Sequence, residues 1–324
     1  MRFVLPANAI EIEQPGTFAL GVVREARSPH APGWLGPHLL ERSSGTGCRG
    51  GGQLGKCVAF SVVRIAHISD IHCGEPHFVP GLIERAINEI NDVQPDIVVC
   101  SGDLTAMGFK HEYMEAKAYL DRLECDCVVV IPGNHDSRNV GYIHFEELFG
   151  ARNQVVQREG VTIVAVDSTE PDLDHGQIGR GRYAWIEEQF VEGGAELRIF
   201  VLHHHLLPIP GTGRERNIVY DAGDAIECLQ RSGVDIVLSG HKHVPYAWRL
   251  EDLFVINAGT VSSQRLRGKT RPCYNLIEIT DHHVDVWRKY PFHGQEKIIQ
   301  FSTETRSFEK YTARIEDEVT PARS

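Results

Sequence analysis

The stretch VVVIPGNHD, residues Val128–Asp136, decides the fold of this chain. Its β-branched residues run directly into a Pro-Gly pair, a pattern typical of a buried strand that ends abruptly. Asn134, His135 and Asp136 follow the glycine, so an amide, an imidazole and a carboxylate leave the strand at one point. Other apolar runs end the same way, in Asp70-Ile71-His72, Gly102-Asp103 and Gly240-His241-Lys242-His243. Polar clusters at successive strand ends predict one shared site.

Strand-like and helix-like patterns alternate from Val62 onward. The first of them are strand 62–70, helix Pro80–Val93, strand Asp96–Asp103, helix Glu112–Leu123 and strand Cys127–Asp136. The next are strand 161–168, helix 182–192, strand 197–205, helix 223–232 and strand 234–243. This alternation predicts parallel strands joined by crossover helices. Beyond residue 243, the segments 253–260, 274–280, 283–290 and 297–303 are spaced as consecutive, mostly antiparallel strands. We therefore predict a mixed α/β protein with two packed sheets.

The two ends of the chain differ from its middle. Residues 1–62 are rich in turn-forming residues and lack sustained apolar periodicity, so they can bury too little surface to offset their ordering entropy. We expect a disordered extension or wrongly included upstream sequence there, with a small appended subdomain as the alternative. One domain is expected over residues 63–305, followed by a C-terminal tail over 306–324.

Composition narrows the class of protein. The net charge is −11 and no long Lys/Arg run is present, which argues against a groove for long nucleic acid and against a stable nucleic-acid partner. The eight cysteines include several in strand-like or helix-like runs, which favours reduced, buried thiols. We find no apolar stretch long enough for a membrane span and no signal pattern, and so expect a cytoplasmic protein.

The polar strand ends carry the residue types of a metal centre. Residues i and i+2 of a strand lie on the same side, so each D-x-H or H-x-H pair can present two donor atoms to one point. Each pair alone is weak evidence, because 17 histidines guarantee chance pairs. The whole set is stronger, and it comprises Asp70, His72, Asp103, Asn134, His203, His241 and His243. Oxygen and imidazole ligands without thiolate suit Mn, Fe, Co or Zn, and seven ligands suit two such ions.

These motifs resemble those of the calcineurin-like metallophosphoesterases, whose blocks are D-x-H, G-D, G-N-H-D, a strand-ending histidine and G-H-x-H. All five stand here in order over roughly residues 63–290. The stretches PDIVVCSGDLT, VDIVLSGHKH and INAGTVSSQRLRG are similar to the branch with bacterial class III cyclic-nucleotide phosphodiesterases. The resemblance implies a four-layer α/β/β/α sandwich of two mixed sheets flanked by helices.

The resemblance also implies roles for the site residues. It assigns Asp70, His72 and His243 to one ion and Asn134, His203 and His241 to the other, with Asp103 between them. A hydroxide bridging the two divalent ions is then the nucleophile. His135 contacts the substrate, stabilising phosphoryl oxygens or protonating the leaving group, and Asp136 orients His135. Both residues also have a plainer interpretation as turn residues, which is stronger for Asp136.

The run His203-His204-His205 leaves open which histidine is the ligand. His203 is preferred because it comes first after the strand, while His204 points the other way and His205 has no assigned role. The function expected is a phosphodiesterase for small phosphodiesters, with 3′,5′-cyclic nucleotides as the leading candidates. The alternatives are a nuclease or phosphomonoesterase of the same fold, or a non-catalytic protein-interaction scaffold. Whether the chain forms a homodimer is left open.

Overall fold

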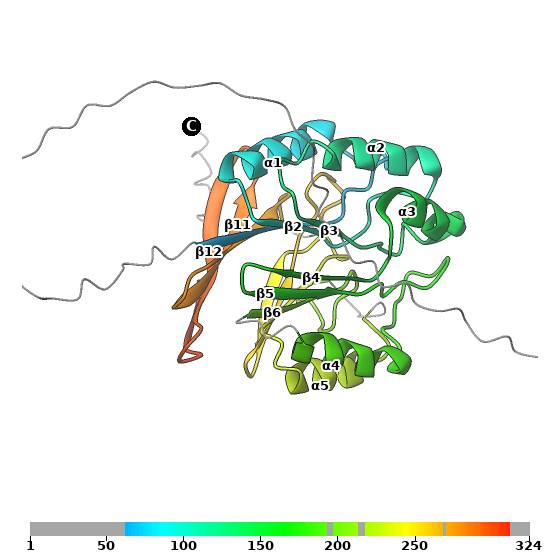
Figure 1. The fold of residues 1–324 in the computed structure, drawn as a ribbon. Helices are drawn as coiled ribbons and strands as arrows, with labels where there is room; N and C mark the ends of the chain where they lie inside the picture. The colour runs from blue at the N-terminus through cyan, green and yellow to red at the C-terminus, as the bar shows by residue number, and fades with distance from the viewer. Residues whose placement is uncertain (1–61, 193–196, 213–217, 268–269, 312–324) are drawn as a thin grey trace, which may run out of the picture. The chain divides into compact units, whose positions relative to one another are not determined.

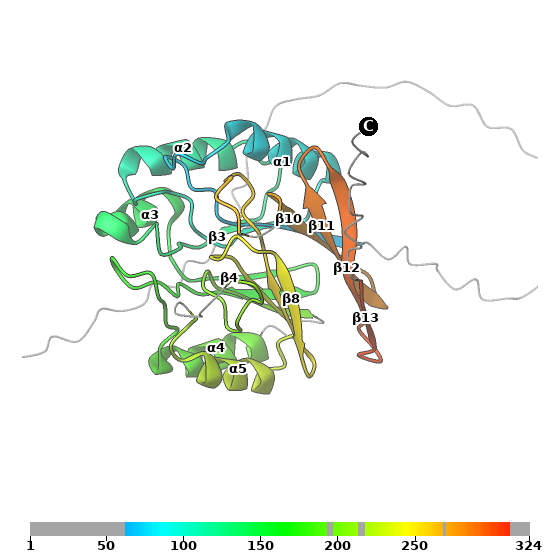
Figure 2. The ribbon, with the colours of Figure 1, turned by 180° about the vertical axis from the view of Figure 1, so that it is seen from behind.

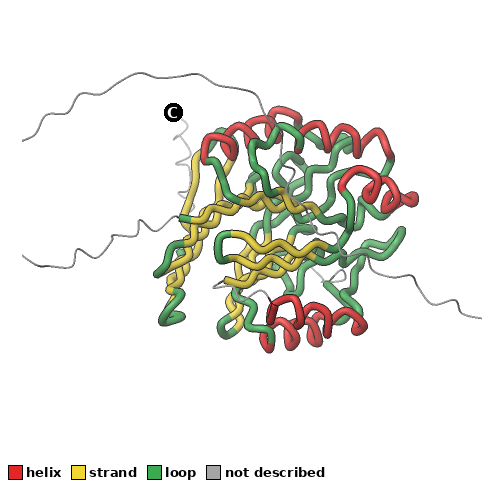
Figure 3. The backbone as a smooth tube through the Cα atoms, viewed as in Figure 1, coloured by secondary structure: helices red, strands yellow, loops and turns green. Residues whose placement is uncertain are grey.

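The computed structural model describes residues 62–192, 197–212, 218–267 and 270–311. Within these ranges two mixed sheets lie face to face, with helices on the outer face of each (Figure 1). Helices α1 (Pro80–Val93), α2 (Lys110–Leu120) and α3 (Gly141–Phe149) cover one side, and α4 (Tyr183–Glu192) and α5 (Ala222–Arg231) cover the other (Figure 3). The predicted four-layer α/β/β/α sandwich is confirmed.

The first sheet has seven strands within the described ranges. Their spatial order is β13 (Phe308–Lys310), β12 (Gly294–Ser302), β11 (His283–Tyr290), β10 (Tyr274–Ile279), β1 (Val63–Ile68), β2 (Ile97–Cys100) and β3 (Val128–Val130). Strands β1, β2 and β3 are parallel, whereas β10 to β13 are antiparallel neighbours. Figure 2 shows β10 to β13 at the far end of this sheet from β3.

The second sheet has six strands in the described residues. Their order is β4 (Gln154–Arg158), β5 (Val161–Ala165), β6 (Leu197–Val201), β7 (Ile236–Ser239), β9 (Leu253–Asn257) and β8 (Tyr246–Leu250). Strands β5, β6, β7 and β9 run parallel to one another. The carboxyl ends of parallel strands meet at one edge of a sheet, which is where open α/β sheets place their ligands.

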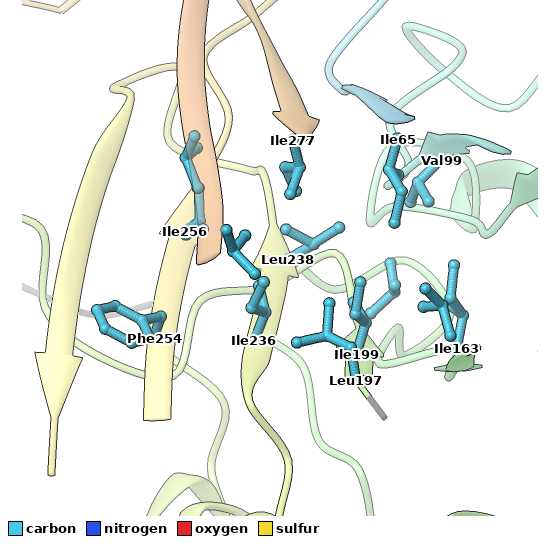
Figure 4. Close-up of a cluster of buried hydrophobic side chains, with 14 of the residues drawn as sticks. Ile65, Val99, Ile163, Leu197, Ile199, Ile236, Leu238, Phe254, Ile256 and Ile277 are labelled. Carbon is cyan, nitrogen blue, oxygen red and sulfur yellow. The ribbon is translucent and has the colours of Figure 1, made fainter. Parts of the chain in front are cut away.

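The main hydrophobic core lies between the two sheets. Side chains such as Ile65 and Val99 of the first sheet face Ile199 and Leu238 of the second (Figure 4), and all four are fully buried. Burial of each such side chain contributes about 1.5–3 kcal/mol relative to an exposed position. Because strand side chains alternate, neighbours of these residues such as Ile68 face the opposite way and pack in a second core with α1 and α2. Both sheets are thereby rigid supports for the loops at their ends.

The predicted elements match the observed ones in large part, and they differ in the following ways. Helix α1 has the predicted bounds, but α3, β4 and β8 were not predicted. The segment 253–260 was expected to pair with the antiparallel strands that follow it, and this is wrong. It forms β9, which joins the second sheet parallel to β7, because the β8 and β9 hairpin returns the chain beside β7. Strand β13 pairs with β12 beyond residue 305, the expected end of the domain.

Two further expectations depend on the chain as a whole. Residues 1–61, which make up nearly all of the expected extension, lie outside the described residues. Six of the eight cysteines are described, and all six are free thiols, four of them buried. No helix in the described ranges has the length and apolar character needed to cross a membrane.

Candidate metal centre

The loops after β1 and β7 bring the first group of candidate ligands together. His72 Nε2 lies 3.7 Å from Asp70 Oδ1 and 2.8 Å from His243 Nε2. His243 Nε2 in turn lies 3.3 Å from Asp70 Oδ1. Asp70, His72 and His243 are all buried, so three donor atoms from two sheets converge on one point that water reaches poorly. This trio is the set that the resemblance implied for one ion.

The second group gathers around the amide oxygen of Asn134. Asn134 Oδ1 lies 2.9 Å from His241 Nδ1 and 3.2 Å from His203 Nε2. Asn134 follows β3, His203 follows β6 and His241 follows β7, so the group also spans both sheets. The donor atoms of Asp103, His203 and His241 form a second cluster capable of holding a cation.

Asp103 lies between the two groups. Its Oδ2 atom is 3.6 Å from His72 Nε2 and 3.4 Å from His203 Nε2. The other oxygen, Oδ1, accepts a hydrogen bond of 2.9 Å from the backbone N–H of His135. One oxygen is thus fixed by the backbone while the other faces both histidines, which is the arrangement that a bridging carboxylate requires.

The hydrogen bonds around the histidines fit a metal centre. His203 Nδ1 lies 2.8 Å from the Ser101 carbonyl, and His243 Nδ1 lies 2.8 Å from the Arg265 carbonyl. A carbonyl only accepts, so each Nδ1 carries a proton and each Nε2 is the ring atom left to bind a cation at the centre. Metal-ligating histidines are commonly oriented in this way by a backbone carbonyl.

The electrostatics of the pocket favour positive charge. Burial acts to raise the pKa of Asp70 and Asp103, but the surrounding imidazoles outweigh it and hold both pKa values well below the usual range. Burial acts to lower the pKa of His203, yet the Asp103 carboxylate raises it to about 9. Two ionised carboxylates buried among imidazoles attract protons or a divalent cation. A donor set of imidazole, carboxylate and amide oxygens suits Mn, Fe, Co or Zn.

The backbone at the centre is strained. Non-glycine residues with φ in the left-handed region include five candidate ligands: Asp70 (56°), His72 (58°), Asp103 (55°), His241 (77°) and His243 (57°). Such conformations cost about 1–3 kcal/mol each and persist where the surrounding structure enforces them, typically at functional sites. The grouping of these left-handed φ angles at five candidate ligands is an observation independent of the side-chain distances, and it indicates the same functional site.

Two glycines permit the close approach of the loops. A Cβ at Gly133 would overlap the Oδ1 and backbone N atoms of Asp103. A Cβ at Gly240 would overlap Ser69 Oγ and would lie 2.5 Å from Asp70 Oδ2. Any side chain at either glycine would therefore displace a candidate ligand, which explains physically why the G-N-H-D and G-H-x-H motifs begin with glycine.

His135 lies at the edge of the centre. Its ring centroid is 4.7 Å from that of His72, and His72, Asp103 and His135 form a third cluster of converging donor atoms. Its Nδ1 donates to the Ala106 carbonyl over 2.7 Å, so Nε2 is the atom left to act in the site. Burial lowers the pKa of His135, and the nearby positive groups His72 and Arg138 act in the same direction against Asp103.

Asp136 does not contact the His135 side chain, contrary to the role that the resemblance implied. Its carboxylate accepts hydrogen bonds of 2.8–3.0 Å from four donors: the N–H groups of Leu104, Thr105 and Gly133 and the Thr105 hydroxyl. Burial and the charge of Asp103 raise the pKa of Asp136 to about 6. The carboxylate therefore ties the loop after β2 to the loop after β3, and its effect on His135 is through the backbone.

The three consecutive histidines have different surroundings. His203 contacts Asn134 and Asp103, as described above. His204 places Nδ1 2.9 Å from Ser168 Oγ, and its ring centroid lies 4.8 Å from that of His241. His205 is buried, and its ring is stacked on His241 with centroids 5.6 Å apart. The geometry favours His203 as the ligand, and it places His205 against a candidate ligand although no role was expected for it.

Three residues near the centre were not among the sequence candidates. Arg138 and Asp174 form an ion pair of 2.6 Å, and Asn134 Nδ2 donates to the same Asp174 oxygen over 3.3 Å. Arg265 supplies the carbonyl that orients His243 and pairs with Glu75 through its side chain. A basic residue two positions after G-N-H-D was the available signal for Arg138.

Comparison with known proteins identifies the family. The calcineurin-like phosphoesterase model matches residues 63–245, which is more than half of the 324-residue chain. A probable cyclic nucleotide phosphodiesterase of Rhodococcus erythropolis is 25% identical over 248 residues, covering 68% of this chain and 81% of the relative. The glycerophosphodiester phosphodiesterase GpdQ of Enterobacter lignolyticus is 26% identical over 232 residues, covering 65% of this chain and 83% of the relative.

Solved structures agree on the fold. A purple acid phosphatase from yellow lupin seeds matches with a TM-score of 0.59 at 16% identity, covering 72% of this chain and 52% of that one. The structure titled PhoD matches with a TM-score of 0.57 at 10% identity, covering 78% of this chain and 72% of the other. From the motifs, the sandwich and the family match together, the chain belongs to the calcineurin-like phosphoesterases and is a hydrolytic phosphoesterase.

Proposed function

We propose that this protein is a dinuclear metal-dependent phosphodiesterase that hydrolyses small phosphodiesters, with 3′,5′-cyclic nucleotides as the leading substrates. The observation that carries the proposal is the position of Asp103, whose Oδ2 atom faces His72 of one group and His203 of the other. One carboxylate oxygen between two clusters of ligands is what a pair of ions about 3.5–4 Å apart would share.

The residues have distinct tasks in this proposal. Asp70, His72 and His243 would hold one ion, Asn134, His203 and His241 the other, and Asp103 would bridge them. Bound divalent ions polarise a phosphoryl oxygen and lower the pKa of water, so that a nucleophile is available near neutral pH. No covalent protein nucleophile is then needed.

His135 would contact the substrate. Its Nδ1 proton is committed to the Ala106 carbonyl, so contact with the substrate is through Nε2. The alkoxide leaving group of a cyclic nucleotide is poorer than the aryl oxide of p-nitrophenyl phosphate, so its cleavage would gain more from a proton on His135 Nε2, which requires the doubly protonated ring. The strained, buried loops around it hold this geometry before a substrate arrives.

Two observations favour a small diester over the alternatives. Several relatives are named as cyclic nucleotide phosphodiesterases, including the CpdA enzyme of Escherichia coli, which is 25% identical over 150 residues. The acidic net charge of −11 opposes a long polyanion such as DNA. The fold alone does not decide, because a Plasmodium structure titled as an anchor, GAP50, also matches, with a TM-score of 0.55. The set of candidate ligands is complete here, as an enzyme requires.

A substrate panel with the Mn²⁺-loaded protein tests the proposal. It compares bis(p-nitrophenyl) phosphate, p-nitrophenyl phosphate, 3′,5′- and 2′,3′-cyclic AMP, a glycerophosphodiester and single-stranded DNA under one condition. We expect the small diesters to turn over fastest. Faster turnover of the monoester would contradict the diester assignment, and degradation of DNA without cleavage of cyclic nucleotides would assign the protein as a nuclease.

A further inference from the structure

Arg138 is a positively charged group beside the candidate centre. The Nη1 atom of Arg138 lies 3.2 Å from His135 Nδ1. The Arg138 side chain is 23% exposed, so the guanidinium is open to solvent while close to the site. His135 Nδ1 donates to the Ala106 carbonyl, and Arg138 Nη1 also points to that carbonyl at 3.5 Å. The guanidinium therefore lies alongside the imidazole as a second donor, and it stays charged at any physiological pH.

Asp174 neutralises this charge. Its Oδ1 atom accepts a hydrogen bond of 2.6 Å from Arg138 Nη2 and one of 3.3 Å from Asn134 Nδ2. One exposed carboxylate oxygen thus contacts both a cation at the edge of the site and the amide of a candidate ligand. Arg138 thus directs Nη2 to Asp174, while its Nη1 is directed to the Ala106 carbonyl.

The surrounding backbone fixes Arg138 in this position. Asn139 and Val140 follow it with φ angles of 49° and 56°, and Val140 is β-branched, a residue type for which such angles are unusual. The Asn139 N–H donates to Asp172 Oδ1 over 2.9 Å, which joins this segment to the loop that carries Asp174. Arg138 and Asp174 are therefore held face to face from both sides.

We propose that the Arg138–Asp174 pair makes the site selective for singly charged phosphodiesters over doubly charged phosphomonoesters. A monoester or inorganic phosphate brings a second negative charge, for which a free guanidinium is a bidentate partner. Asp174 occupies that guanidinium and repels the dianion more strongly than the monoanion. The inference rests on the proposed phosphodiesterase function and names the residues that set its substrate class.

The test removes the charge of Asp174 and keeps its shape. Asn at position 174 still offers an oxygen to Asn134 Nδ2, so Asp174→Asn separates charge from hydrogen bonding. Asp172→Asn is the matched control, because it makes the same charge change on the same loop and Asp172 pairs with the Asn139 backbone rather than with Arg138. The readouts on Mn²⁺-loaded protein are the dissociation constant of inorganic phosphate and the ratio of kcat/KM for bis(p-nitrophenyl) phosphate to that for p-nitrophenyl phosphate.

We expect Asp174→Asn to bind phosphate about 3- to 10-fold more tightly and to lower the diester-to-monoester ratio by a similar factor. Asp172→Asn should change neither quantity, and metal content should stay at the wild-type level. Adding Arg138→Gln to Asp174→Asn should abolish the gain in phosphate binding. Equal effects of the two Asp variants, no effect of either, or a gain that survives Arg138→Gln would overturn the inference.

Phosphate binding can be measured without turnover. The proposed phosphodiesterase function and the proposed role of the Arg138–Asp174 pair can therefore be contradicted independently of each other. A wild-type protein that does not hydrolyse small diesters would contradict the proposed function, even where Asp174→Asn tightens phosphate binding. A wild-type protein that hydrolyses cyclic AMP while Asp174→Asn leaves the phosphate affinity unchanged would contradict the role of the Arg138–Asp174 pair alone.

Discussion

The Nε2 atoms of His72 and His243 lie 2.8 Å apart, although 171 positions separate the two residues in the sequence. His243 Nδ1 donates to the Arg265 carbonyl, so Nε2 is the ring atom that points toward His72. Both rings are buried beside the Asp70 carboxylate. The two imidazoles and the carboxylate are directed at one buried point. A divalent cation can bind there in place of a proton shared between the two Nε2 atoms.

Asp103→Ala should lower metal content at both positions. Asp103 Oδ2 faces histidines of both groups, so its loss removes a ligand from each ion. Elemental analysis of Mn²⁺-loaded protein should give about two ions per chain for the wild type and clearly fewer than one for the variant. Asp121→Ala, at an exposed position on the end of α2, is the control and should keep the wild-type content. Loss of only one ion would show that Asp103 is not shared.

His203 and His204 should respond differently to truncation. His203→Ala removes the ring that contacts Asn134 Oδ1, and we expect it to lose bound metal. His204→Ala removes a ring bonded to Ser168 Oγ, and we expect metal content to remain. Metal titration of both variants checks this. Metal loss in His204→Ala with retention in His203→Ala would reverse the assignment.

His135→Ala should leave metal content nearly unchanged and lower kcat by roughly 10²–10⁴-fold, the range for loss of a general acid or an oxyanion partner. The physical reason is its place at the edge of the centre, with Nε2 directed into it. His282→Ala, at an exposed position, serves as the control. Parallel losses of metal and activity would instead make His135 a ligand, since it can join His72 and Asp103 in a cluster.

The sequence predicted the candidate ligands because their chemistry is local to strand ends. Asp70 and His72 follow the end of β1, and His241 and His243 follow the end of β7, but these residues lie in loops with left-handed φ angles, and His241 and His243 contact different groups of candidate ligands. Asp103 and Asn134 follow the next two strands of the same parallel set, and parallel strands bring their carboxyl ends together. The meeting of the motifs at these strand ends was therefore predictable, whereas the division of His241 and His243 between the two groups was implied only by the resemblance.

Other parts of the site depend on the paths of irregular loops. Arg138 meets Asp174 across 36 positions, because a loop after β5 returns over the centre, and no periodicity in the sequence reports such a path. The expected contact between Asp136 and His135 failed for a similar reason. Neighbours in a tight turn point in different directions, and the buried N–H groups of Leu104, Thr105 and Gly133 required an acceptor.

Asp136→Asn should destabilise the fold more than it affects the chemistry. An amide offers one oxygen and one NH₂ group, so N–H donors of the two loops would face N–H groups of the new side chain. Leaving a buried backbone donor unsatisfied costs about 1–3 kcal/mol, so we expect a fall in Tm of several degrees. Thermal unfolding followed by circular dichroism measures the change. An unchanged Tm would show that the carboxylate does not hold the loops together.

Hydrolysis of 3′,5′-cyclic AMP by the purified protein tests most directly the proposal that this phosphoesterase uses bound metal ions to cleave small phosphodiesters. Product formation should be followed by chromatography with the protein loaded with Mn²⁺, after removal of metal by a chelator, and after Mn²⁺ is restored. We predict AMP formation by the loaded protein, loss of activity after chelation and recovery on reloading. No AMP from the loaded protein, or equal activity with and without metal, would contradict the account.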